Sequence, residues 1–276
     1  MLTALMLVLL LARVTACSSS DQSSQPLPVA STPPALHLLP LPYGIELYSD
    51  DASAQLASEW LNEALSYIWN YAGMAHASLG PTQWLEWESR GNDCFECGYT
   101  VGGEMPVEAR FSCCLGGDTL GWEYRLIGYC PDGTICRRAL RTRGTTDALG
   151  NSGELRYYAG EDSLHPVLSW RFAAAADRDS SSWRFYAGTP DPLALVGLMD
   201  WSQDAAGTRR WDWRWPEDER LLITFHPDST AGACRSWLWN AGAGGWDLKH
   251  DFEWSGGHGS WVTYSVTGEP IAERVW

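Results

Sequence analysis

Lysine is almost absent from this sequence, because Lys249 is the only one and arginine supplies the other basic side chains. Acidic residues outnumber basic residues by 34 to 19, which leaves a formal net charge of −15. A chain this acidic repels the phosphate backbone of nucleic acids and the surface of anionic membranes. We therefore expect no nucleic-acid partner.

Motifs of the common enzyme classes are also missing. The chain has no Gly-x-Ser-x-Gly, no His-Glu-x-x-His, no phosphate-binding glycine loop and no EF-hand loop, and its six histidines lack metal-ligand spacing. We expect a protein that is not an enzyme, without catalytic residues, metal or cofactor. Two weaker alternatives are half of a catalytic triad at His226-Pro227-Asp228 or at His258-Gly259-Ser260. A third is a weak calcium site at Glu217-Asp218-Glu219.

No apolar run is long enough to cross a bilayer, which takes roughly 20 residues. The longest one at the start, Leu2 to Ala12, has the length of the hydrophobic part of a secretory signal. It leads into Val14-Thr15-Ala16-Cys17, which resembles the lipobox of bacterial lipoproteins. The resemblance implies a diacylglyceryl group on the sulfur of Cys17 and cleavage just before it. An ordinary cleaved signal peptide, with an incidental cysteine, is the alternative.

Residues 17–42 are rich in Ser, Gln and Pro and show no apolar period. Such a segment buries too little apolar surface to offset its ordering entropy, so we expect a disordered tether after a signal peptide of residues 1–16. In lipoproteins, serines such as Ser18 and Ser19 after the cysteine imply sorting to the outer membrane. We expect a lipid-anchored protein of the bacterial envelope, whose folded domain comprises residues 43–276.

The first ordered element should be a helix in residues 43–80. Apolar residues recur at spacings of three and four from Ala52 to Ala77, which draws one stripe along a helix. Asp50 or Asp51 can cap its start, and Gly80-Pro81 ends the pattern. The predicted stripe consists of Leu56, Trp60, Leu61, Leu65, Ile68, Trp69 and Ala72.

Everything after Pro81 has the pattern of strands, with a cysteine-rich part at 81–150 and a Trp-rich part at 151–276. The clearest strand, Trp246 to Trp254, places Trp246, Leu248, Phe252 and Trp254 on one face. This period of two indicates a half-buried antiparallel sheet. We predict a mainly β fold, an antiparallel hairpin or meander sheet with the amphipathic helix packed on it. Turns are predicted at Pro131-Asp132-Gly133, Gly150-Asn151-Ser152-Gly153, Ser255-Gly256-Gly257 and Thr267-Gly268.

Seven cysteines remain after Cys17, and in an oxidising compartment disulfides are the first interpretation. Cys130 and Cys136 flank a Pro-Asp-Gly turn and should form a local bridge. We expect the other four, Cys94, Cys97, Cys113 and Cys114, to pair among themselves across strands, which leaves Cys234 as the odd thiol. Because adjacent residues of a strand face opposite ways, Cys113 and Cys114 should take different partners. A zinc site that begins at Cys94-x-x-Cys97 is the alternative.

One local basic stretch stands out on this acidic chain. It could receive a phosphate-bearing glycolipid or an acidic partner, or it is a solvated strand face balanced by nearby carboxylates. Its basic residues are Arg137, Arg138, Arg141 and Arg143.

The Trp-rich part has an internal period. Strands with an aromatic pair begin at Leu155, Trp183, Trp211, Trp237 and Trp261, with 28, 28, 26 and 24 residues between successive starts, and a second aromatic follows each start. The last copy, Gly259-Ser260-Trp261-Val262-Thr263-Tyr264 with Gly268 and Trp276, resembles a MORN-type β-hairpin repeat of the antitoxin-like variety. The resemblance covers Leu155 to Trp276 and implies stacked hairpins that serve as an interaction scaffold.

These observations favour a lipid-anchored, non-enzymatic scaffold for another envelope protein. A second hypothesis is a binding module for a glycan or lipid, which would use exposed faces of Trp211, Trp213 or Trp239 because aromatic rings stack on sugars. A third is a hydrolase whose site is assembled from separate loops.

Overall fold

The computed structural model describes residues 33–36, 47, 51–103, 106–158, 164–175, 178–187, 194–226, 228 and 230–276, apart from the side chains of 67–72 and 74–78. The signal peptide, Cys17 and most of the predicted tether lie outside these residues. Within the described residues, one helix, α2 (Ala52–Leu79), and a short 3-10 helix, η1 (Gly80–Gln83), precede a 15-stranded sheet. The strands are β1 (Glu88–Gly91), β2 (Cys94–Val101), β3 (Val107–Gly116), β4 (Thr119–Tyr129), β5 (Ile135–Asp147), β6 (Ser152–Tyr157), β7 (Leu168–Ala174), β8 (Arg178–Tyr186), β9 (Leu195–Asp204), β10 (Arg209–Arg214), β11 (Glu219–Phe225), β12 (Ala231–Asn240), β13 (Gly245–Ser255), β14 (His258–Tyr264) and β15 (Pro270–Val275).

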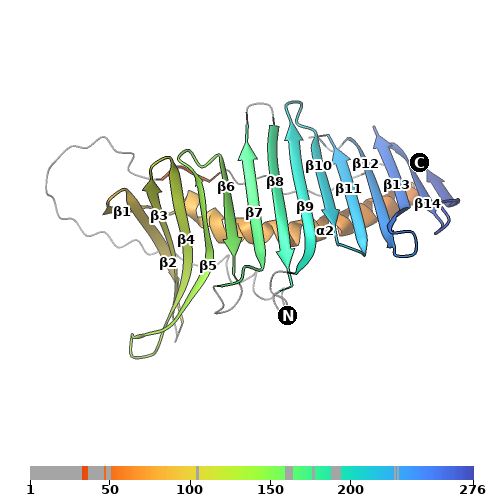
Figure 1. Ribbon diagram of the computed structural model, residues 1–276. Coiled ribbons are helices and arrows are strands. Elements are labelled where there is room, and N and C mark those ends of the chain that lie inside the picture. Colours follow the sequence, from red (N-terminus) through yellow and green to blue (C-terminus); the bar gives the residue numbers. More distant parts are fainter. Residues whose placement is uncertain are drawn as a thin grey trace.

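The sheet is a meander in which every strand pairs antiparallel with the next strand along the chain (Figure 1). This confirms the predicted fold class. The four predicted turns all lie where strands meet, between β4 and β5, β5 and β6, β13 and β14, and β14 and β15. Gly133 and Gly268 adopt positive φ angles of 78° and 80° there, a conformation that side chains other than glycine rarely adopt. Because each described strand pairs with its neighbours in the sequence, the described part of the sheet contains no crossover.

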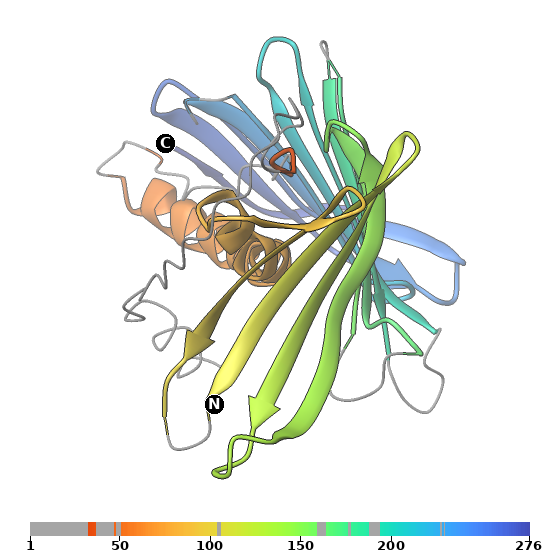
Figure 2. The same ribbon diagram turned by 90° about the vertical axis from the view of Figure 1, so that its left-hand side faces the viewer.

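Helix α2 lies inside the curve of the sheet and crosses the strands (Figures 1 and 2). We call the sheet face that packs against it the inner face and the opposite one the outer face. A row of stacked aromatic rings runs along the inner face, with ring centroids 6.1 Å apart from Trp170 to Trp183 and again from Trp183 to Trp211. These rings and the apolar side of α2 form one continuous core.

The start of α2 is fixed by Asp51, whose carboxylate accepts a 2.7 Å hydrogen bond from the backbone N–H of Ser53. Leu61 and Leu65 of the predicted stripe are buried, and Trp60 stacks on Phe252 of β13 at 4.7 Å between ring centroids. The side chains of Ile68, Trp69 and Ala72 are outside the described residues. The predicted stripe is wrong at one position: Leu56 is exposed, while the small side chains of Ala54, Ala57 and Ala64 are buried and allow the helix to approach the sheet closely.

One part of the predicted tether is packed. Leu36 is only 2% exposed and belongs to the core, and its carbonyl oxygen accepts a hydrogen bond from Gln83 at 3.4 Å. The carbonyl oxygen of Ala35 lies 2.8 Å from the position that a Cβ atom on Gly150 would occupy, so this turn needs glycine. The expectation of disorder up to residue 42 is therefore wrong for residues 33–36, because a single leucine in a polar segment can fill a gap in the core.

Each unit of the sequence repeat corresponds to one hairpin. The predicted starts at Leu155, Trp183, Trp211, Trp237 and Trp261 fall in β6, β8, β10, β12 and β14, and the second aromatics fall in or just after the partner strands. Stacked hairpins share one aromatic face, which none of them could bury alone.

One strand prediction fails because of a β-bulge. The register of β12 and β13 shifts so that Ser236 pairs with His250 but Trp237 pairs with Leu248, which leaves Lys249 as the extra residue. One extra residue turns every following side chain to the opposite face. Phe252 and Trp254 stay on the inner face, whereas Trp246 and Leu248 lie on the outer face.

The aromatic row makes a direct prediction about stability. Replacement Trp211→Ala should lower the free energy of unfolding by about 3–5 kcal/mol, because it empties a fully buried position between two other rings. Urea denaturation followed by circular dichroism measures the change. Trp84→Ala is the matched control, since Trp84 is 61% exposed, and its effect should be below about 1 kcal/mol. Equal losses in the two variants would contradict a core built on this row.

Candidate binding surfaces

The inner face of the sheet offers no exposed tryptophan platform at Trp211 or Trp213. Each of these side chains is 1% exposed, Trp211 beside Trp183 and Trp201, and Trp213 beside Phe185. The expectation that they present open faces to a ligand is wrong, because both occupy inward positions of β10.

Paired charges cover much of the outer face. Glu123 on β4 lies between Arg125 and Arg143, with nitrogen–oxygen distances of 2.7 Å to each, and Glu154 on β6 has the same arrangement with arginines of β6 and β7. Burial opposes ionisation of Glu123, but the hydrogen bonds from Arg125 and Arg143 outweigh it and lower the pKa of its carboxyl. The outer face therefore carries arginine–carboxylate clusters, and in the Glu123 and Glu154 clusters the arginines favour the ionised carboxylate.

A cluster of partly exposed tryptophans interrupts this charged surface at one end of β12 and β13. Trp239 and Trp246 are a cross-strand pair whose rings meet edge to face at 5.3 Å. Trp237 lies beside them, and the guanidinium of Arg220 is 5.1 Å from its ring centre. We call Trp237, Trp239 and Trp246 the outer tryptophan cluster. Trp239 was predicted as a binding residue, but its two neighbours were not. Alternation along β12 already places Trp237 on the face of Trp239, whereas Trp246 reaches that face only because of the bulge at Lys249.

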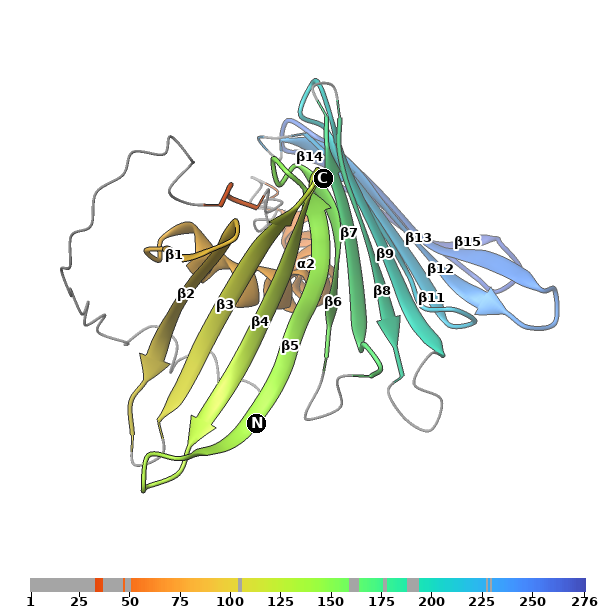
Figure 3. The same ribbon diagram turned by 60° about the vertical axis from the view of Figure 1, so that its left-hand side comes forward.

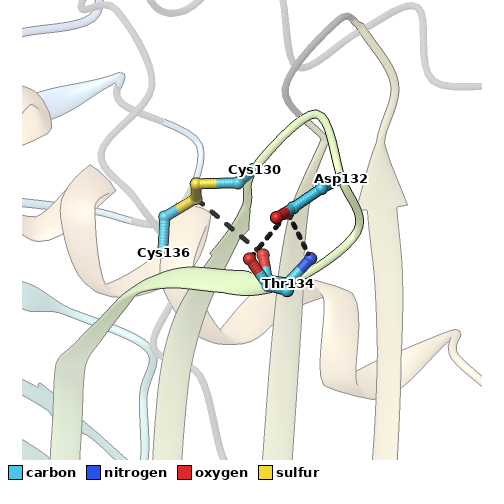
Figure 4. Close-up of a disulfide and its surroundings, with 4 residues drawn as sticks. All are labelled: Cys130, Asp132, Thr134 and Cys136. Carbon is cyan, nitrogen blue, oxygen red and sulfur yellow. Dashed lines mark hydrogen bonds between the residues drawn. A yellow bond between two sulfur atoms is a disulfide. The ribbon is translucent and has the colours of Figure 1, made fainter.

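The β4–β5 hairpin ends in a cross-linked tip (Figure 4). Cys130 and Cys136 form the expected local disulfide. Inside the loop, one carboxylate oxygen of Asp132 accepts hydrogen bonds from the hydroxyl and the backbone N–H of Thr134, at 2.7 and 2.9 Å. These bonds lower the pKa of Asp132. The tip projects past the neighbouring turns (Figure 3), and the apolar side chain of Ile135 is exposed there.

The basic stretch on β5 does not form one patch. Arg137 and Arg138 pair with successive residues of β4 and so point to opposite faces of the hairpin. Arg143 belongs to the Glu123 cluster, and Arg141 is the extra residue where the β4–β5 register shifts. The alternation of strand faces and one bulge therefore divide the predicted cluster. Arg138, near the tip, remains exposed on the outer face.

The four upstream cysteines pair only in part. Cys94 and Cys114 are opposite each other on β2 and β3 and form a disulfide, while Cys97 and Cys113 are buried free thiols. This differs from the expected two bridges. Phe111 is opposite Cys97, so the two free cysteines are diagonal neighbours. Diagonal positions are about 7–8 Å apart, beyond the reach of a disulfide in a regular sheet.

The residues named as possible half-triads come together in part. His226 follows β11 and His258 begins β14, and both line one depression of about 570 Å³ with Ser260, while Pro227 is outside the described residues. Of the turn carboxylates, Glu219 begins β11, and burial together with the nearby charge of Asp218 raises its pKa. Within the described residues, no three His, Cys, Asp or Glu side chains are grouped so that they could hold a metal ion. No helix of the described part has the length and apolar character needed to cross a membrane.

No known protein-family model matches this chain, and no curated protein matches it in sequence. The functional argument therefore depends on the surfaces described above.

The buried thiols generate a prediction about reactivity. Burial raises the pKa of Cys97 and of Cys113 to about 12, and it also raises that of Cys234, so very little reactive thiolate exists near pH 8. A Cys17→Ala protein should therefore leave these three thiols unmodified by a thiol-exchange reagent while folded. All three should react after unfolding in urea. Rapid modification of the folded protein, or a bridge between Cys97 and Cys113 on peptide mapping, would contradict this assignment.

Proposed function

We propose that this protein is a bacterial envelope lipoprotein, anchored through Cys17 in the outer membrane, and that its β domain is a non-enzymatic scaffold for another envelope protein. Export is supported by the Cys94–Cys114 and Cys130–Cys136 bridges, since disulfides persist in oxidising compartments. The lipobox-like Val14-Thr15-Ala16-Cys17 supports the anchor. The stack of hairpins supports a scaffold role of the kind that MORN-type repeats serve.

The observation that carries the partner-binding proposal is the cross-linked tip of the β4–β5 hairpin. Its disulfide and the Asp132–Thr134 hydrogen bonds hold a loop whose residues 131–138 are all exposed. Such a bridge adds nothing to the burial of the core. A loop that is already rigid loses less conformational entropy when a partner binds, so its contact residues contribute more of their energy to affinity. Ile135 supplies an apolar contact, and Arg138 supplies a charge that an acidic partner can pair.

The proposal predicts where a partner can be captured. A photo-reactive amino acid at Ile135 should cross-link the protein in living cells to one envelope protein. In the same cells, an alkynyl fatty acid should label the protein. Cys17→Ala should abolish the label and strongly reduce the cross-link, because the domain is then no longer held at the membrane.

Position Val266 is the matched control for the cross-link, since it is 80% exposed in the β14–β15 turn and distant along the sheet from the tip. A product from Ile135 but not from Val266 supports a partner at the tip. The same products from both positions, or none from either, would exclude the tip as the contact, and persistent fatty-acid labelling of Cys17→Ala would exclude the anchor.

A second candidate function, glycan binding, is favoured by the outer tryptophan cluster. Trp239 and Trp246 present partly exposed rings on a rigid sheet, and Arg220 covers Trp237. Aromatic faces of this kind pack against the apolar faces of sugar rings while neighbouring polar groups bond to the hydroxyls. The cluster, in contrast to Trp211 and Trp213, lies on the side of the sheet away from α2.

Glycan binding predicts a change in tryptophan fluorescence. Titration with envelope glycan fragments should shift the emission of the native protein, and Trp239→Ala should weaken the apparent affinity about tenfold, the effect expected when one stacking ring is lost. Trp84→Ala is the control, because Trp84 is exposed but lies outside the cluster. An unchanged spectrum, or an equal effect of both replacements, would rule out the cluster as the binding site.

A further inference from the structure

A depression of about 530 Å³ lies on the outer face over β7 to β10. Short polar side chains form its floor. The register places Ser180 of β8 opposite Ser202 of β9 and Ser182 one row further along, opposite Asp200. Because these serines lie between strands with long side chains, the middle of the sheet face is hollow.

Arginines stand on both sides of this floor. Arg171 of β7 is the cross-strand partner of Ser182, Arg210 of β10 is the partner of Ser202, and Arg178 begins β8. Neighbouring strands are about 4.8 Å apart, so three strand spacings, roughly 14 Å, separate the backbones of β7 and β10. Long arginine side chains from the two sides can therefore converge above the serines.

Two of these guanidiniums lack a close ion pair: among the described residues Arg178 has none, and Arg210 has only a long one. Arg178 has no ion pair with any residue that the structure describes, and its cross-strand neighbour Asp204 uses one carboxylate oxygen to accept two backbone N–H groups of the following turn. Arg210 is 3.8 Å from Asp212, whose carboxylate already accepts two hydrogen bonds from Arg220.

The remaining charges of the depression are paired. Arg171 contacts Glu154 at 2.7 Å, and Arg214 contacts both Asp200 and Asp212. The lining holds four arginines and two aspartates, and Glu154 outside it neutralises Arg171, so one positive charge remains in excess on a chain with a net charge of −15. Guanidinium groups are planar forks that match phosphate and sulfate oxygens, and serine hydroxyls donate further hydrogen bonds.

We infer that this depression binds the phosphate or sulfate group of an esterified ligand, held between Arg178 and Arg210 above the serines. Its volume is within the range of small-molecule sites and exceeds that of a bare ion, which indicates an ester with a group about the size of a sugar. The inference goes beyond the scaffold and glycan proposals and does not depend on them, because the depression shares no residue with the β4–β5 tip or with the outer tryptophan cluster.

Isothermal titration of the folded Cys17→Ala protein at low ionic strength tests this site. The probes are glucose 6-phosphate, glucose 6-sulfate, inorganic phosphate and glucose. Both esters should bind, inorganic phosphate should bind more weakly, and glucose should not bind. Arg178→Gln and Arg210→Gln should each weaken binding of the esters about tenfold, which corresponds to about 1.4 kcal/mol. Ser202→Val should also weaken binding, because it fills the floor without a change in charge.

Arg235→Gln is the matched control. It removes one positive charge from the same face, but Arg235 pairs with Asp251 and lies outside the depression, so affinity should be unchanged. Equal weakening by Arg235→Gln would show general charge attraction and overturn the site. The site would also be overturned if neither sugar ester bound and no vesicle with phosphatidic acid retained the protein, or if Arg178→Gln and Arg210→Gln bound the esters as the native protein does. Retention only on vesicles that contain phosphatidic acid, lost in Arg178→Gln, would support the site and assign the phosphate to a lipid headgroup.

Discussion

A single-layer sheet must cover one of its faces, and in this protein that constraint is met by aromatic stacking against one helix. The rings of Trp170, Trp183 and Trp211 lie in a row along the inner face, and α2 crosses the strands over the same surface. Each hairpin adds its own rings to the row, so adjacent units stabilise one another. Because burial is concentrated on this side, the outer face keeps its polar residues and is available to ligands.

The charged composition of the outer face follows from this contrast between a buried inner face and an exposed outer face. Arginine almost completely replaces lysine in this chain, and clusters such as Arg125–Glu123–Arg143 use its forked geometry to bind one carboxylate from two strands. Individual exposed ion pairs contribute little to stability, typically about 0–1 kcal/mol. Their regular arrangement has a different consequence: places where the pairing is incomplete, at Arg178 and Arg210, become local cationic sites on an acidic protein.

The fold could be predicted because its determinants are local. Alternation, turn residues and the spacing of aromatic pairs lie within single strands or hairpins, and each unit of the repeat corresponds to a hairpin. The sites could not be predicted to the same extent. One extra residue at Lys249 reverses the face of Trp246, and no residue pattern indicates that bulge. The proposed phosphate or sulfate site joins side chains from four strands, β7 to β10, and only the complete register brings Arg171 and Arg210 to the same depression.

The packing of residues 33–36 distinguishes the two ends of the strands. This segment meets the sheet beside Gly150, in the turn after β5, whereas the disulfide between Cys130 and Cys136 is at the other end of that strand. The 13 residues of β5 span about 40 Å at the rise of an extended strand. The packed segment and the stiff loop therefore lie at opposite ends of one long strand, so the two contacts are made on opposite edges of the sheet.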